Sequence, residues 1–136
     1  MGWLSRLLGR AEPSLVESEP PVAPDYCDLR GLPSIRTRVK GSANYVTDAQ
    51  RIAASGTEYV LVREPTNEHD SSAIVVYGRG VKLGYVSRAK AASMAPSLDL
   101  IGAAGYLVSG AAAAEGNIRL WVDLPRVPDL REFARG

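Results

Sequence analysis

From residue 35 onward, the sequence forms short runs of alternating or β-branched residues, separated by glycines, prolines and polar residues. Ile35, Thr37 and Val39 alternate with three cations, which is the period of a strand with two different faces. Residues 57–64 are rich in β-branched and aromatic side chains and end before Pro65. Four more runs favour strands, at residues 73–77, 81–86, 103–109 and 118–124. The pattern therefore predicts six short strands.

Turns and short helices complete this picture. The tight turn over residues 78–80 joins two of the runs and predicts a hairpin. Helical patterns cover residues 49–54 and 88–94, and Pro96 is expected to weaken or end the second helix. Because strands and helices do not alternate, we expect a mainly β protein, built as a small six-stranded OB-like or SH3-like barrel with two short helices.

The barrel domain is expected to span residues 35–125, because the flanking segments differ from it in composition. Residues 1–10 form an amphipathic N-terminal segment, interpreted either as a docking or interfacial helix or as a terminus that folds against its own domain or stays mobile. Residues 11–34 carry prolines among acidic residues and are interpreted as a Pro-rich acidic linker. Residues 126–136 form a charged C-terminal tail with room for one helical turn.

Several classes of protein are excluded by the composition. No run approaches the roughly 20 apolar residues of a membrane span, and no apolar segment of signal-peptide length follows the first residues. Cys27 is the only cysteine and His69 the only histidine, so neither a disulfide framework nor a Cys/His zinc site fits within one chain. We expect a cytoplasmic protein, and the excess of arginine over lysine favours a bacterial source with a GC-rich genome.

The charge is divided unevenly along the chain. Residues 11–28 carry five acidic residues and no lysine or arginine, whereas residues 34–124 carry ten basic and eight acidic residues. This mildly basic domain permits nucleic-acid binding without requiring it. Arg36, Arg38 and Lys40 form a basic stripe on one face of a predicted strand. Such a stripe suits a phosphate backbone, and it equally suits an exposed strand that charge protects from aggregation.

Two linked motifs of glycines, loop residues and small apolar residues run through the predicted domain. They comprise Gly41, then Glu64-Pro65-x-Asn67-x-x-Asp70-x-x-Ala73-Ile74-x-Val76, then Gly84-Tyr85, then Ala91 and Pro96. This set, at this separation, resembles the HIRAN domain over about residues 35–124. The HIRAN domain is a small module that occurs at the N-terminus of SNF2-type helicases that remodel stalled replication forks, and also as short bacterial proteins.

The resemblance implies an OB-like barrel that binds single-stranded DNA and captures its free 3′ end. Asn67 and Asp70 would help to form the pocket for the terminal nucleotide and its 3′-hydroxyl, which an amide and a carboxylate can read together. His69 stands where the family often has a tyrosine that stacks on a base. A second interpretation is open for each: Asn67 and Asp70 tie the turn through bonds to backbone N–H groups, and His69 is an ordinary exposed loop residue.

Two further residues are assigned by the same resemblance. Arg88 follows the Gly-Tyr motif and would contact phosphate, while Tyr45 would supply an aromatic ring after Gly41. The family also offers an arginine in that loop, where this chain has Ala43. Tyr85 itself is expected to belong to the core.

The sequence therefore predicts a single-stranded DNA-binding module, monomeric and associated with the nucleoid, that recognises 3′ ends in DNA repair or fork processing. No motor motif is present, so a helicase or repair partner would supply remodelling. The alternative is a non-catalytic adaptor that uses the barrel as scaffold and residues 1–10 for docking. A nuclease with a metal at Glu64, Glu68, His69 and Asp70 is disfavoured because all four lie in one loop. We expect no catalytic residue, metal or cofactor.

Overall fold

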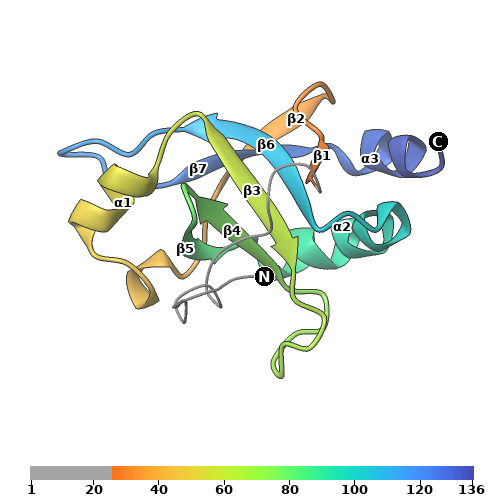
Figure 1. Ribbon diagram of the computed structural model, residues 1–136, viewed down its shortest axis with the longest axis horizontal. Helices are drawn as coiled ribbons and strands as arrows, with labels where there is room; N and C mark the ends of the chain where they lie inside the picture. The colour runs from red at the N-terminus through yellow and green to blue at the C-terminus, as the bar shows by residue number, and fades with distance from the viewer. Residues whose placement is uncertain (1–25) are drawn as a thin grey trace, which may run out of the picture.

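The computed structural model describes residues 26–136, whose strands form one curled sheet (Figure 1). Six antiparallel strands follow one another across the sheet in the order β2-β7-β6-β3-β4-β5, and β1 runs parallel to the start of β6. The predicted mainly β, barrel-like fold is thus confirmed. The strands are β1 (Tyr26–Asp28), β2 (Ser34–Arg38), β3 (Glu58–Arg63), β4 (Ile74–Gly78), β5 (Val81–Tyr85), β6 (Gly105–Ala111) and β7 (Trp121–Pro125).

The two ends of this curled sheet meet through Lys40 and Tyr85. The backbone N–H of each residue donates to the carbonyl oxygen of the other, over 2.8 and 2.9 Å. Gly84 makes this approach possible, because a Cβ atom at that position would lie 2.4 Å from the Lys40 carbonyl oxygen. The segment that follows β2 is therefore held against β5, and it carries residues 40–46 toward the loop between β3 and β4.

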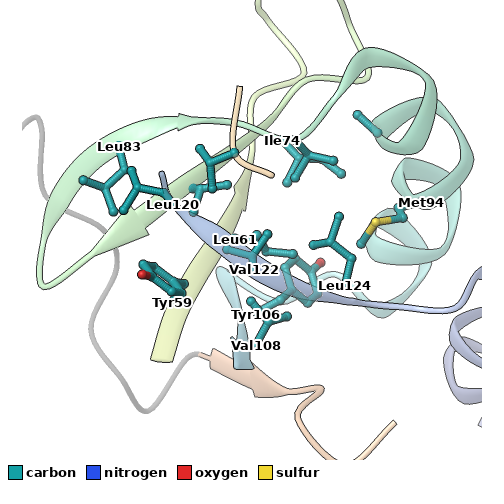
Figure 2. Packing of buried hydrophobic residues seen from close by; sticks show 14 of the residues in the cluster. Tyr59, Leu61, Ile74, Leu83, Met94, Tyr106, Val108, Leu120, Val122 and Leu124 are labelled. Atoms are coloured by element: carbon teal, nitrogen blue, oxygen red, sulfur yellow. The ribbon is translucent and has the colours of Figure 1, made fainter. Parts of the chain in front are cut away.

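The core lies inside the curl of the sheet and under the helix formed by Arg88–Ile101. Leu61, Ile74, Leu83 and Met94 are completely buried and belong to one apolar cluster (Figure 2). Two buried tyrosines find hydrogen-bond acceptors within it, as polar groups removed from water require. The Tyr59 hydroxyl donates to the Ala111 carbonyl at 2.8 Å, and the Tyr106 hydroxyl donates to the Leu98 carbonyl.

Within residues 26–136, four helical elements connect or cover the strands. They are the 3₁₀ helix η3 (Ser42–Asn44) and the α-helices α1 (Asp48–Ala54), α2 (Arg88–Ile101) and α3 (Val127–Ala134). Thr47 and Gln50 form a reciprocal capping box at the start of α1, which explains where that helix begins. None of the helices within residues 26–136 is long and apolar enough to cross a membrane.

The predicted end of α2 at Pro96 is wrong, because the helix continues through the proline to a C-cap at Gly102, whose φ is +72°. A proline removes one backbone donor and clashes with the preceding turn. Here the buried side chains Met94 and Leu98 lie on either side of it, so packing against the sheet outweighs the local preference.

Two segments expected to lie outside the domain contain regular structure. Tyr26–Asp28, placed in the linker by sequence, pairs with β6, and Leu29 after it is buried. The C-terminal segment, expected as a charged tail with room for one helical turn, forms the eight-residue helix α3, with Leu130 fully buried and the helix packed beside α2. The amphipathic segment 1–10 and the linker up to residue 25 lie outside the described residues.

Candidate nucleic-acid interface

A concave site of about 520 Å³ lies where the loop between β3 and β4 meets β5 and the start of α2. We call it the loop pocket. It brings together six of the predicted binding residues, together with Tyr85, which sequence analysis assigned to the core. The six are Lys40, Tyr45, Asn67, His69, Asp70 and Arg88. The loop itself projects from the sheet between β3 and β4 (Figure 1).

Asn67 and Asp70 shape this loop through bonds to its backbone. The Asn67 Oδ1 atom accepts from the backbone N–H groups of His69 and Asp70, over 2.8 and 3.0 Å. The Asp70 Oδ1 atom accepts from the N–H of Ser72 at 2.9 Å. The turn-tying interpretation of both residues is therefore confirmed. Their role in binding stays a prediction, and the second Asp70 oxygen, Oδ2, lies 3.6 Å from the Arg88 Nε atom.

Glu64, at the end of β3, connects this loop to the sheet. Its Oε1 atom accepts from Asn67 Nδ2 and from the Tyr85 hydroxyl, each at 2.7 Å. The Tyr85 oxygen in turn accepts from Lys82 Nζ at 2.9 Å. Partial burial alone would raise the pKa of Glu64, but the bonds from Asn67 and Tyr85 and the nearby Lys82 charge outweigh it, so the pKa is lowered. The carboxylate is thus held in its charged form.

Aromatic side chains line one wall of the loop pocket. The rings of Tyr45 and Tyr85 have their centroids 5.8 Å apart and are tilted by 55°. The Lys82 ammonium lies 4.5 Å from the centroid of Tyr45 and 4.8 Å from that of Tyr85, within cation–π range. The side chain of His69 is 85% exposed, so its ring is accessible to a ligand. Base–aromatic stacking is the contact that such rings offer to a single strand.

Arg88 combines two tasks at the pocket. Its Nη2 atom donates to the His69 carbonyl, which ties the loop to the first turn of α2. Most of the side chain is nevertheless exposed, so the guanidinium also presents its charge at the mouth of the pocket. Its neighbour Asp70 provides the opposite charge, and the pair places a cation and an acceptor side by side.

The basic stripe of β2 is divided by the structure. Arg36 forms a two-point ion pair with Asp123 of β7, at 2.8 and 3.1 Å, and lines neither the loop pocket nor the concavity beside it. Arg38 lines that neighbouring concavity, which also contains Lys40. The expected apolar face of this strand is not uniformly buried, since Ile35 is 55% exposed while Val39 is 4% exposed. Ile35 lies on an edge strand, where nothing described covers it.

Sequence analysis missed three residues of this surface. Lys82 and Tyr85 lie three positions apart on β5, a spacing that gives no sign of a shared contact in a strand. Tyr85 belongs to a quoted motif, yet its hydroxyl, not only its ring, serves the site. Arg119 precedes β7 and reaches the same surface as Arg38 only because the strands pair. No local pattern marks it.

The acidic residues of the loop do not converge. Glu64 faces Tyr85 and Asn67, whereas Glu68 and His69 are highly exposed and lie 3.8 Å apart. Within residues 26–136, no three His, Cys, Asp or Glu side chains form a group that could hold a metal ion.

Comparisons with known proteins agree with this fold. The family model of the HIRAN domain matches residues 34–124. A crystal structure of a protein from Lactobacillus plantarum is similar, with 20% identity, a TM-score of 0.54, and coverage of 67% of this chain and 90% of that one. The crystal structure of the HIRAN domain of human HLTF gives 20% identity, a TM-score of 0.48, and coverage of 74% and 88%. No curated protein matches the chain.

Proposed function

The chain belongs to the HIRAN family of nucleic-acid-binding modules, and from this premise we propose that it binds single-stranded DNA at a free 3′ end. The observation that supports this proposal is the composition of the loop pocket, where aromatic rings, two cations and one carboxylate surround a volume of about 520 Å³. That volume lies within the range of about 300–1,000 Å³ typical of small-molecule sites. We propose a binding role without catalysis, in DNA repair or fork processing.

The aromatic and basic residues of the loop pocket suit the bases and phosphates of a DNA single strand. Tyr45 and His69 offer rings on which bases stack, a contact worth about 1–3 kcal/mol per base in known complexes and tolerant of sequence. Lys40 and Arg88 both line the pocket and provide charge for phosphates. A duplex keeps its bases paired and its stacking faces covered, so the pocket favours a single strand.

The Asp70 carboxylate suits the 3′ end of a DNA strand. Asp70 Oδ2 is an acceptor for a 3′-hydroxyl, because Oδ1 is already engaged with the Ser72 N–H. Asn67 uses its oxygen and one amide hydrogen within the protein, which leaves a second amide hydrogen for the same hydroxyl. A 3′-phosphate would meet the Asp70 charge and be repelled, so selectivity for the free hydroxyl follows.

The experiment compares a linear strand with a circle. Fluorescence anisotropy is measured with an internally labelled linear single strand carrying a 3′-hydroxyl, a covalently closed circle of the same sequence, and a blunt duplex. We expect the linear strand to bind at least about tenfold more tightly than the circle, a difference of about 1.4 kcal/mol. The duplex is expected to bind more weakly than the linear strand.

Equal affinity for the linear and the circular single strand would contradict capture of the 3′ end. The protein would then be a barrel that binds single-stranded DNA without reading its end. Absence of binding to all three at low salt would overturn the DNA proposal altogether. The adaptor hypothesis would then take its place, although its docking segment, residues 1–10, lies outside the described residues.

A further inference from the structure

A second concavity of about 360 Å³ lies beside the loop pocket and shares Lys40 with it. We call it the basic pocket. Four cations from separate parts of the chain line it, and no acidic residue does. They are Arg38 of β2, Lys40 after it, Arg51 of α1 and Arg119 before β7.

Arg51 forms a fixed part of the wall. It is only 7% exposed, its Nη1 atom donates to Asp48 at 2.8 Å, and its Nε atom donates to the Ser42 hydroxyl at 3.1 Å. The ion pair with Asp48 compensates its charge. Arg51 therefore positions the segment that follows β2 against α1.

The other three cations are uncompensated. Among the described residues, none of Arg38, Lys40 and Arg119 forms an ion pair, and all three are exposed. Like charges around one concavity repel each other and raise the local concentration of anions. By contrast Arg36, the other cation of β2, is neutralised by Asp123. The positive charge is thus concentrated where the surface is hollow.

We propose that the basic pocket binds the phosphodiester groups of the strand behind its 3′ end. This inference rests on the proposed function, because the terminal nucleotide must occupy the loop pocket. Lys40 belongs to both concavities and provides the point where the backbone passes from one to the other. The bound DNA strand then leaves the loop pocket toward β2 and the segment before β7, rather than along α2. The site accordingly spans several nucleotides and has a defined direction.

The test uses a dinucleotide and an octanucleotide of thymidine, both with a 3′-hydroxyl, and the variants Arg38→Gln and Arg119→Gln. Because both side chains are exposed and unpaired in the described part of the chain, the variants are expected to fold normally. Arg135→Gln serves as control, since it lies at the end of α3, at the opposite end of the molecule from α1 (Figure 1). Competition against a labelled strand gives each affinity.

Each of the two variants is expected to weaken the octanucleotide severalfold and to leave the dinucleotide unchanged. The slope of log K against log salt for the octanucleotide should fall by about 0.7 per removed contact. Neutral methylphosphonate linkages placed at internal positions should weaken binding to the wild type, and weaken it less in the variants. Arg135→Gln should match the wild type throughout.

Three results would overturn the inference. If both variants bind the octanucleotide as the wild type does, the basic pocket carries no phosphate, while the loop pocket and the proposed function stand. If they weaken both oligonucleotides equally, their effect lies at the loop pocket. If the wild type binds neither oligonucleotide, the inference and the proposed function fall together.

Discussion

The hydroxyl of Tyr85 donates to the Glu64 Oε1 atom at 2.7 Å, and this one bond links the closing strand of the sheet to the base of the binding loop. The same oxygen accepts from Asn67, so the Asn67 amide is fixed with its own oxygen toward the loop backbone. The position of the loop pocket therefore depends on the sheet and not on the loop residues alone.

Replacement of Glu64 by glutamine should alter how stability depends on pH. The folded-state pKa of Glu64 lies below its ordinary value of 4.5, so below that pH the unfolded state takes up the proton first. The stabilisation is present above about pH 4.5 and is lost as pH falls through the folded-state pKa. Urea unfolding of the wild type should therefore show a steeper loss of stability between about pH 5 and pH 3 than unfolding of Glu64→Gln. Parallel curves would contradict this role of the Glu64 carboxylate.

Substitution of Gly84 by alanine should destabilise the fold where the two ends of the sheet meet. The new Cβ atom would meet the Lys40 carbonyl oxygen at 2.4 Å and the Val39 Cγ1 atom at 2.8 Å. We expect a loss of about 1–3 kcal/mol in the free energy of unfolding, measured in urea. Gly31→Ala is the matched control, because nothing lies within 4 Å of its added Cβ, and it should stay within about 0.5 kcal/mol of the wild type. Equal stability of Gly84→Ala and Gly31→Ala would show that the two ends of the sheet are not tightly packed at Gly84.

Strands β2 to β7 were predictable because each carries its own local signal. Alternation and β-branched residues identify β2 through β7, and the Gly78–Gly80 turn identifies the hairpin. The three-residue strand β1 lacks such a signal, since its pairing is decided by β6. The full lengths of α2 and α3 were likewise missed, because Met94, Leu98 and Leu130 stabilise those helices through burial and not through local propensity.

The candidate site was predictable where a residue belongs to a family motif or to a local charge pattern. The family resemblance identifies Asn67, His69 and Asp70 in one polar loop, and it also identifies Tyr45 and Arg88. The contribution of Tyr85 and Lys82 depends on the closure of the sheet, which brings the start of the 40–46 segment and β5 together. Arg119 joins Arg38 only through the pairing of β2 with β7. Contacts between residues that are distant in the sequence leave no local pattern from which they could be predicted.

Arg88→Gln should weaken the binding of every single strand, whatever group its 3′ end carries. The exposed Arg88 guanidinium presents its charge at the loop pocket, so its loss should lower the salt slope by about 0.7. Arg36→Gln is the comparison, because Asp123 already compensates that charge at 2.8 Å, and we expect little change in its salt slope. Anisotropy titrations at three salt concentrations distinguish the two. A larger effect at Arg36 than at Arg88 would contradict the assignment of Arg88 as a phosphate contact at the loop pocket.

The most direct test of the account measures the choice between a 3′-hydroxyl and a 3′-phosphate in the wild type and in Asp70→Asn. Asparagine retains the oxygen that accepts from Ser72, so the loop should keep its shape while the repelling charge is lost. Glu132→Gln, an exposed acidic residue of α3, controls for the change in net charge.

The wild type and Glu132→Gln should prefer the hydroxyl by at least about tenfold, or about 1.4 kcal/mol. Asp70→Asn should bind both ends with similar affinity, because the 3′-phosphate is no longer repelled. A wild type indifferent to the 3′ group, or an Asp70→Asn variant that keeps the full preference, would contradict the claim that Asp70 reads the free end of the strand.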